Sequence, residues 1–199
     1  MIRAALTGSI GMGKSTTAAM FAERGAALWD ADAAVHRLYG PGGAAVPAIA
    51  ALAPGAVRHG AVDRARLRQA VLADDALLPR VEAAVHPLVL ADRAAFLEAA
   101  AQEGRAVAVC DIPLLFETGA ADAFDAVIVA SAPAETQRAR VLAREGMTEE
   151  SFRAILARQT PDAEKRARAD YVVETGRGLE AARAQVARIM AELEARARA

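Results

Sequence analysis

The stretch Gly8-Ser9-Ile10-Gly11-Met12-Gly13-Lys14-Ser15 decides the fold of this chain, because it reads G-x-x-x-x-G-K-S. This spacing binds nucleotide phosphates when a strand leads into the loop and a helix leaves it. Residues 2–6 form a short apolar run, typical of a buried strand, and residues 17–24 have the apolar spacing of a helix that ends at Gly25. The stretch therefore predicts a phosphate-binding loop in an α/β protein.

Each residue type in this loop has a physical reason for its place. Glycines lack a Cβ, so the backbone can curl its N–H groups around phosphate oxygens. The helix that starts near Lys14 adds its positive N-terminal end. Lys14 supplies a mobile charge for the β- and γ-phosphates, and the Ser15 hydroxyl is placed to ligate Mg²⁺. The predicted nucleotide site consists of Gly11, Met12, Gly13, Lys14, Ser15 and Thr16.

The composition favours one globular domain, residues 1–199, without a membrane or nucleic-acid partner. No apolar run approaches the ~18 residues of a membrane span, and no leader pattern opens the chain. The net charge of −1 argues against a general nucleic-acid binder. Cys110 is the only cysteine and has apolar neighbours, which predicts a buried thiol in a reducing, cytoplasmic compartment. A chance Lys-Ser after a glycine-rich turn is the alternative to a phosphate loop, but the chain has only two lysines, Lys14 and Lys165.

Two carboxylates follow the second predicted strand. Residues 26–29 are short and apolar, and they end in Asp30-Ala31-Asp32. In an open α/β sheet, ligands bind at the carboxyl ends of the strands. Aspartate is also a good N-cap, and residues 33–39 favour a helix. We assign Asp30 mainly to capping or support and Asp32 mainly to chemistry.

Residues 40–103 have a different pattern, which predicts a helical insertion between the second and third strands. Gly40-Pro41-Gly42-Gly43 is a break that offers a hinge, and turns are expected at Pro54-Gly55 and His59-Gly60. Pro87 is expected to open a further helix. The apolar positions that share a helical face are Leu67, Val71 and Leu72, then Leu77, Leu78, Val81 and Val85.

The insertion also contains most of the candidate polar ligands. Four of its arginines, at positions 64, 66, 68 and 93, form either a solvated face or a ligand-binding group. The three histidines, His36, His59 and His86, have no spacing suited to a metal, which argues against zinc.

Three further strands complete a predicted five-stranded parallel sheet. They are expected at residues 106–112, 124–130 and 171–173, with helices at 133–145 and 148–159 between them. Asp111 lies at the end of the first of these strands, where a carboxylate could hold a Mg²⁺-bound water. A closing amphipathic helix at 179–198 is expected to turn inward Val186, Ile189, Met190 and Leu193.

Among phosphate-loop proteins, a small-molecule kinase fits this chain best. A GTPase needs a base-reading N/T-K-x-D segment, but Lys165 is followed by Arg-Ala-Arg. A transport ATPase normally has a strand that ends in Asp-Glu, but Asp111 is followed by Ile-Pro. A kinase needs a lid that brings cations over the phosphates, and residues 133–160 contain Arg138, Arg140 and Arg144.

Several segments together resemble the dephospho-coenzyme A kinase family, in that family's order and over nearly the whole chain. They are A-L-T-G-S-I-G-M-G-K-S-T (5–16), D-A-D-A-A-V-H (30–36), V-D-R-A-R-L-R (62–68), His86-Pro87, D-I-P-L-L-F-E (111–117), Gln137 with Arg140 and Arg144, and A-D-Y-V-V (169–173). Glu174-Thr175-Gly176 departs from the Asp-Asn that this family more often has near an adenine-contacting loop.

This resemblance implies transfer of the ATP γ-phosphate to the ribose 3′-hydroxyl of dephospho-coenzyme A, the last step of coenzyme A synthesis. ATP and Mg²⁺ are then the implied cofactors, and ATP and dephospho-coenzyme A the implied partners. Separately from the resemblance, we expect a monomer rather than an oligomer. Asp32 would orient or deprotonate the hydroxyl, while Lys14 and Arg140 hold the phosphoryl group and Ser15 binds Mg²⁺. Arg64 and His86 would cover the acceptor, and Asp111 is a further candidate Mg²⁺ ligand.

Two other functions stay open at this point. One is phosphorylation of another small acceptor, such as a nucleoside monophosphate. The other is a non-catalytic regulatory module that binds a nucleotide. Turnover of ATP with each acceptor separates the three.

Overall fold

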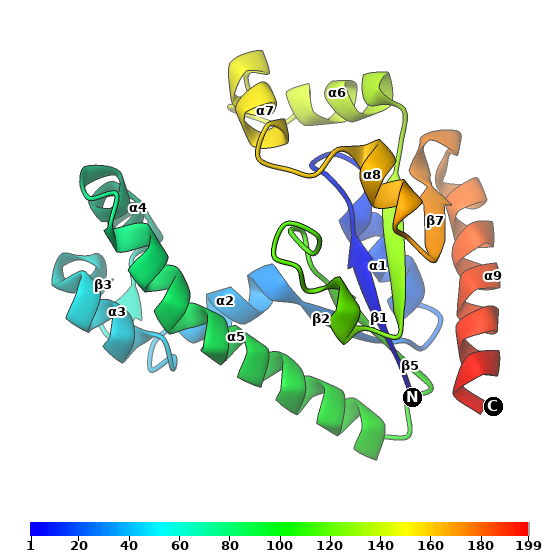
Figure 1. Ribbon diagram of the computed structural model, residues 1–199, viewed down its shortest axis with the longest axis horizontal. Coiled ribbons are helices and arrows are strands. Elements are labelled where there is room, and N and C mark those ends of the chain that lie inside the picture. The colour runs from blue at the N-terminus through cyan, green and yellow to red at the C-terminus, as the bar shows by residue number, and fades with distance from the viewer. Residues whose placement is uncertain (199) are drawn as a thin grey trace. The chain divides into compact units, whose positions relative to one another are not determined.

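Five parallel strands form the main sheet of the computed structural model, which describes residues 1–198 (Figure 1). Their order across the sheet is β2 (Ala27–Asp30), β5 (Val107–Asp111), β1 (Ile2–Thr7), β6 (Ala126–Ser131) and β7 (Tyr171–Glu174). The strand that feeds the phosphate loop is central, since Ala4 lies opposite Val109 on one side and Ala126 on the other. The predicted five-stranded parallel sheet is confirmed.

Alternate residues of strand β1 pack into two different hydrophobic cores, one on each face of the sheet. Ala4 and Leu6 face a core that includes residues of α1 (Lys14–Ala22) and α9 (Leu179–Arg198). Ala5 belongs to a second core, together with Leu115 and Phe116 from the segment after β5. Neighbouring residues of a strand point to opposite faces, so β1 is buried on both sides.

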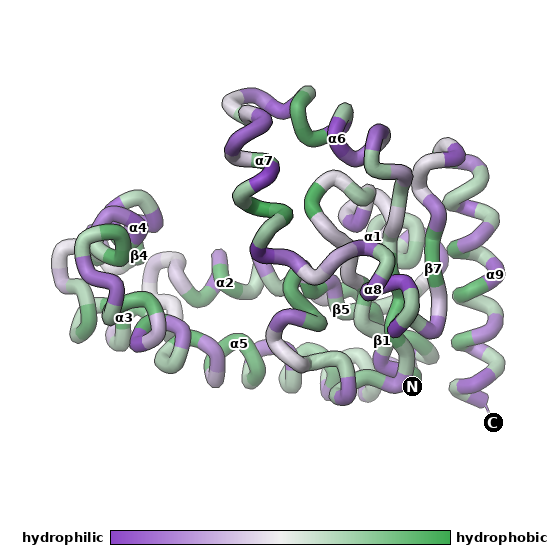
Figure 2. Tube along the Cα trace, turned by 45° about the horizontal axis from the view of Figure 1, so that its top comes forward, coloured by the Kyte–Doolittle hydropathy of each residue, from purple (hydrophilic) through white to green (hydrophobic). Residues whose placement is uncertain are grey.

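Helix α9 closes the first core, as its apolar spacing predicts. The four residues expected to face inward are all buried: Val186, Ile189, Met190 and Leu193. Hydrophobic and hydrophilic positions alternate along this helix in Figure 2.

Three helices lie between β6 and β7. They are α6 (Ala134–Leu142), α7 (Glu149–Leu156) and α8 (Asp162–Ala167). The first two confirm the expected helices with shorter bounds, and the Thr148 hydroxyl caps α7 by accepting the Ser151 N–H. The third helix was not predicted, because its six residues are four charged residues and two alanines and show no apolar period. Two 3₁₀ turns, η2 (Ala121–Ala123) and η3 (Thr175–Arg177), precede β6 and follow β7.

The chain forms two compact units, of which the second comprises residues 30–98 and the first the remainder of the described chain. The second unit contains α2 (Ala31–Tyr39), α3 (Val46–Leu52), η1 (Pro54–Ala56), β3 (Val57–Arg58), β4 (Ala61–Val62), α4 (Arg64–Ala73) and most of α5 (Leu77–Gln102). It has a hydrophobic core of its own, formed by Leu38, Ala45, Ile49, Ala53, Ala56, Val62, Leu67, Leu77, Val81 and Val85.

The structure corrects three expectations in this unit. Pro87 opens no helix and instead lies inside the continuous α5. Proline has no backbone N–H to donate within a helix, but the packing of Val81 and Val85 in the core keeps this helix in place. Leu72 and Leu78 are 74% and 45% exposed, although the spacing placed them on an inward face. Strands β3 and β4 form an unpredicted hairpin, because two-residue strands are too short to show alternation.

The turns and the cysteine agree with the sequence pattern. His59 and Gly60 both have positive φ, 49° and 73°, and they connect β3 to β4 as a two-residue hairpin turn. Cys110 is fully buried in β5. None of the helices within residues 1–198 is long and apolar enough to cross a membrane.

Candidate active site

The phosphate loop lies between the end of β1 and the start of α1. Gly11 and Gly13 take positive φ angles of 77° and 84°, and both approach neighbouring residues closely. A Cβ at Gly11 would lie 2.5 Å from a methyl group of Val141, and one at Gly13 would lie 3.0 Å from the Thr175 hydroxyl. Gly13 is the N-cap of α1 and provides no side-chain cap, so the first-turn N–H groups stay available to an anion.

Lys14 forms an ion pair with Asp111 at the end of the neighbouring strand β5. The Asp111 residue is 1% exposed, whereas the Lys14 side chain is 16% exposed. The lysine is therefore held next to the loop by a buried carboxylate. Ser15 and Thr16, the next two predicted site residues, are exposed on the first turn of α1.

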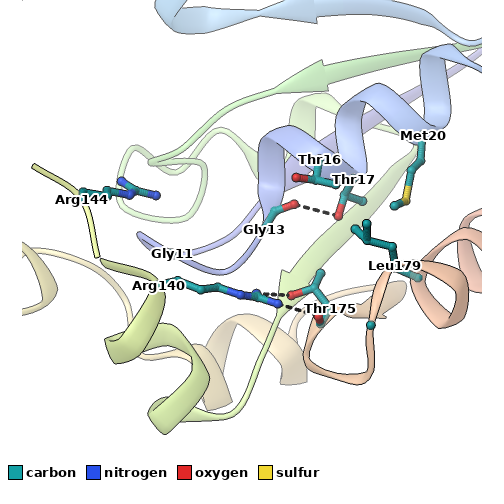
Figure 3. A pocket seen from close by; sticks show the side chains of 11 residues that line it. Gly11, Gly13, Thr16, Thr17, Met20, Arg140, Arg144, Thr175 and Leu179 are labelled. Carbon is teal, nitrogen blue, oxygen red and sulfur yellow. Dashed lines mark hydrogen bonds between the residues drawn. The ribbon is translucent and has the colours of Figure 1, made fainter. Parts of the chain in front are cut away.

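A cavity of about 320 Å³ adjoins the loop on the side of α6 and α9 (Figure 3). Arg140 points toward Thr175, donating hydrogen bonds of 2.9 Å to its hydroxyl and 2.8 Å to its carbonyl oxygen. Met20 and Leu179 supply an apolar end, and Arg144 a second cation. The cavity is lined by Gly11, Gly13, Thr16, Thr17, Met20, Arg140, Arg144, Thr175, Gly178, Leu179 and Ala182.

The third arginine that the sequence placed in the lid has another partner. Arg138 lies 2.8 Å from the Glu149 carboxylate and so connects α6 to α7. Its hydrogen bond with Glu149 lowers the pKa of that carboxyl group. Of the three arginines that the sequence singled out in the lid, Arg140 and Arg144 line the cavity.

Asp30 and Asp32 have different surroundings, and those of Asp30 match the predicted capping role. The Asp30 carboxylate accepts the Ala33 N–H at 2.7 Å and caps α2. Asp32 lies exposed in the first turn of α2. The capping role of Asp30 is confirmed, whereas the chemical role of Asp32 stays a prediction.

Arg64 and His86 belong to the second unit, as Asp32 does. Arg64 is the first residue of α4, and its guanidinium lies 5.8 Å from the centre of the Tyr39 ring. Burial raises the pKa of Tyr39, and the charge of Arg64 opposes that shift. His86 is exposed in α5. The predicted acceptor ligands thus come from one unit and the phosphate loop from the other.

A family model described as dephospho-CoA kinase matches residues 2–180. The chain belongs to the dephospho-CoA kinase family. A relative so named from Cereibacter sphaeroides is 60% identical over 191 residues, which is 96% of this chain and 95% of that protein. Another from Mesorhizobium japonicum is 58% identical and covers 97% of both chains.

Solved structures agree with this family at the level of the fold. The crystal structure of TT1252 from Thermus thermophilus has a TM-score of 0.77 at 33% identity, covering 96% of this chain and 97% of that one. A dephospho-CoA kinase from Campylobacter jejuni has a TM-score of 0.68 at 20% identity, covering 96% of both. The family model and the two relatives confirm the sequence resemblance to the family.

The sequence analysis did not predict the buried ion pair between Lys165 and Glu117. Lys165 is fully buried, and its Nζ lies 2.9 Å from Oε1 of Glu117, which also accepts the Thr160 N–H at 2.7 Å. Burial alone would raise the pKa of Glu117, but the bonds from Lys165 and Thr160 outweigh it and lower the pKa. The available signal was the rarity of lysine, since Lys165 is one of only two in the chain.

Two glutamines of the first unit also bind the phosphate loop. Gln137 donates to the Ile10 carbonyl oxygen at 2.8 Å, and Gln159 accepts the Ile10 N–H at 3.1 Å. Gln137 is part of the family resemblance, but nothing in the sequence pattern singled out Gln159.

Proposed function

We propose that this chain transfers the γ-phosphate of ATP to the ribose 3′-hydroxyl of dephospho-CoA, with ADP and CoA as products. The 3′-oxygen forms a bond to the γ-phosphorus, the bond from that phosphorus to the bridging oxygen breaks, and the hydroxyl proton is released. Family membership supports the reaction. The observation that carries the site is the phosphate loop, in which Lys14 stands beside an uncapped helix N-terminus.

The loop is suited to the triphosphate. The N–H groups of the first turn of α1 and the Lys14 ammonium would bind the β- and γ-phosphate oxygens. Phosphoryl transfer depends on positioning and charge stabilisation, so these groups supply most of what the reaction needs.

Ser15 fits a Mg²⁺ ion, because its hydroxyl is exposed on the first turn of α1, beside the expected phosphate position. Mg²⁺ keeps several waters and takes only one or two protein ligands, so a full protein cage is not required. Within residues 1–198, no group of three or more His, Cys, Asp or Glu residues could hold a metal. When bound, the ion neutralises charge on the phosphate oxygens.

Asp111 has two possible tasks, and its ion pair favours one of them. Since the carboxylate is buried and paired with Lys14, we infer that it holds the ammonium ready for the phosphates. Contact with a Mg²⁺-bound water is the second possibility.

The cavity beside the loop is suited to the adenosine of ATP. Its apolar end at Met20 and Leu179 can cover a purine face. The backbone at Thr175 would take the place of the family's usual asparagine. Arg140 and Arg144 remain our candidates for the cations that neutralise the transferring phosphoryl group.

The acceptor is assigned to the second unit. Asp32, exposed at the first turn of α2, would orient or deprotonate the 3′-hydroxyl. Arg64 and His86 would bind the rest of dephospho-CoA, whose phosphates match an arginine in charge.

The test is turnover with defined acceptors. Purified protein is incubated with ATP, Mg²⁺ and dephospho-CoA, and the formation of CoA and ADP is followed by chromatography. Equal rates with nucleoside monophosphates would favour the other kinase function, and ATP binding without any acceptor turnover would favour a regulatory module. We further infer a monomeric, cytoplasmic enzyme, which light scattering and cell fractionation test.

A further inference from the structure

A single residue of the phosphate loop, Ile10, is hydrogen-bonded through both of its backbone polar groups. The Ile10 carbonyl oxygen accepts a 2.8 Å hydrogen bond from Nε2 of Gln137, and its N–H donates a 3.1 Å bond to Oε1 of Gln159. Ile10 is the third residue of the motif, directly before Gly11, whose φ is positive. Both bonds therefore act where the loop begins to curl around its ligand.

The two glutamines come from opposite ends of one segment. Gln137 lies in the first part of α6, and Gln159 follows the end of α7. Between them are the cavity arginines, Arg140 and Arg144. The residues predicted as a lid, 133–160, are thus attached near both of their ends to the same residue, Ile10.

Each glutamine is itself held in place. Gln137 is 5% exposed and lies on the first turns of a regular helix. Gln159 precedes Thr160, whose N–H donates to Glu117, the partner of the fully buried Lys165. Both hydrogen bonds are already formed in the structure. Ligand binding therefore does not have to include the loss of conformational entropy that ordering these two side chains requires.

We propose that Gln137 and Gln159 are positioning residues that hold the phosphate loop in its curled form before ATP binds. This proposal rests on the proposed function for the identity of the nucleotide. It makes the affinity for any diphosphate depend on two side chains that do not themselves contact phosphate.

The donor and acceptor roles differ, which provides a matched pair of variants. Gln159→Glu keeps an oxygen that can accept the Ile10 N–H. Gln137→Glu puts a carboxylate against the Ile10 carbonyl oxygen and leaves that oxygen without its donor. Both variants add one negative charge near the loop and keep the side-chain size, so the difference between them reports the hydrogen bonds.

The measurement is the affinity for ADP and for pyrophosphate, each with Mg²⁺, by calorimetry at pH 8. We expect Gln159→Glu to bind within about threefold of the wild type, and Gln137→Glu to bind about tenfold more weakly, or worse, because a part-buried acceptor loses its partner. Pyrophosphate has no adenosine, so its affinity reports the phosphate-binding groups without any contact that a purine makes in the cavity.

Alanine variants and amide exchange test the same bonds without added charge. Gln137→Ala and Gln159→Ala should each weaken pyrophosphate binding by about three- to tenfold. The Ile10 amide hydrogen should exchange slowly in the wild type and in Gln159→Glu, and faster in Gln159→Ala.

The proposal is overturned if Gln137→Glu and Gln159→Glu weaken pyrophosphate binding equally, or if both alanine variants bind it as the wild type does. A thermal melt of each variant confirms that the protein is folded at the assay temperature. Because these experiments contain no acceptor, loss of dephospho-CoA turnover in the wild type would refute the proposed function and leave this inference standing.

Discussion

The position of Lys14 between a buried carboxylate and the loop explains why this residue should decide turnover. Its ammonium is paired with Asp111, which is 1% exposed. We infer that ATP, bound as proposed, would give this ammonium a phosphate partner in place of the carboxylate, so that the lysine keeps a counter-charge throughout.

Lys14→Ala should lower the turnover number by about 10²-fold or more, the usual loss when a charge that stabilises the transition state is removed. Some nucleotide binding should survive, because backbone N–H groups at the helix N-terminus supply part of the anion affinity. Steady-state rates with dephospho-CoA and calorimetry with ADP measure the two effects. Turnover above about a tenth of the wild-type value would contradict the role.

Asp30 and Asp32 should respond differently to the same substitution. Asp32→Asn removes the charge of a candidate general base, so the turnover number should fall by about 10²- to 10⁴-fold with little change in ATP affinity. Asp30→Asn keeps a side chain that can cap α2, so its loss of stability should be about 1 kcal/mol or less and turnover should change little. Rates and thermal melts of both variants provide the comparison. An inactive Asp30→Asn beside an active Asp32→Asn would reverse the assignment.

The buried pair Glu117–Lys165 should matter for stability more than any surface pair. Glu117→Ala leaves a fully buried ammonium without the carboxylate 2.9 Å away, and breaking such a pair costs about 3–5 kcal/mol. The double variant Glu117→Ala/Lys165→Met should recover part of that loss, since no uncompensated charge remains. Urea unfolding measures each free energy. A single variant that loses less than about 1 kcal/mol would show that the pair is dispensable.

Strand β1 is fastened at its start by an ion pair whose strength depends on pH. Arg3 donates to Asp125 through Nη2 at 2.8 Å, through Nε at 3.0 Å and through its backbone N–H at 2.8 Å. These bonds, opposed by burial, lower the pKa of Asp125 from 3.8 to about 2. A carboxyl group with a depressed folded-state pKa contributes stability above its unfolded pKa and loses it as the pH falls through the folded one.

The stability difference between wild type and Asp125→Asn should therefore be constant above pH 4 to 5 and shrink toward pH 2. Because the side chains of Arg3 and Asp125 are 47% and 31% exposed, solvent screens the pair, and the full difference should be about 1 kcal/mol or less. Urea unfolding at pH 6, 4 and 3 measures it, with and without added salt. A difference that grows on acidification would have the wrong sign.

The elements that were predictable are those with a local signal. β1 and the phosphate loop were marked by the glycine motif, and α9 by an apolar period over 20 residues. Helix α5 was divided wrongly at Pro87, because packing of its buried face outweighs the local cost of proline. Gln159 could not be found, since its role depends on Ile10, a residue 149 positions away. Contacts of this kind are created by the fold and leave no pattern along the chain.

The chain crosses between its two units at residues 29–30 and 98–99. The Gly40–Gly43 segment, which the sequence suggested as a hinge, lies inside the second unit, where Gly42 donates to the Gly60 carbonyl oxygen. Each unit has a hydrophobic core of its own, so each can move as a body while its own packing stays intact. The hinge at Gly40–Gly43 stays a prediction, and the ends of β2 and α5, where the chain crosses between the units, are a second place for it.

We expect the second unit to move toward the phosphate loop when both substrates are bound. The candidate acceptor residues Asp32, Arg64 and His86 belong to one unit and the loop to the other, so in-line transfer has to bring the two together. Closure also excludes water, which would otherwise hydrolyse ATP.

The test is energy transfer between two dyes, one attached at Gln69→Cys and the other at Arg177→Cys, which are both exposed positions. The native Cys110 is fully buried and should stay unlabelled. Transfer efficiency should change with dephospho-CoA plus a non-hydrolysable ATP analogue, and much less with either ligand alone. Identical efficiencies in the free and doubly liganded protein, with binding of both ligands verified, would show that the units do not close.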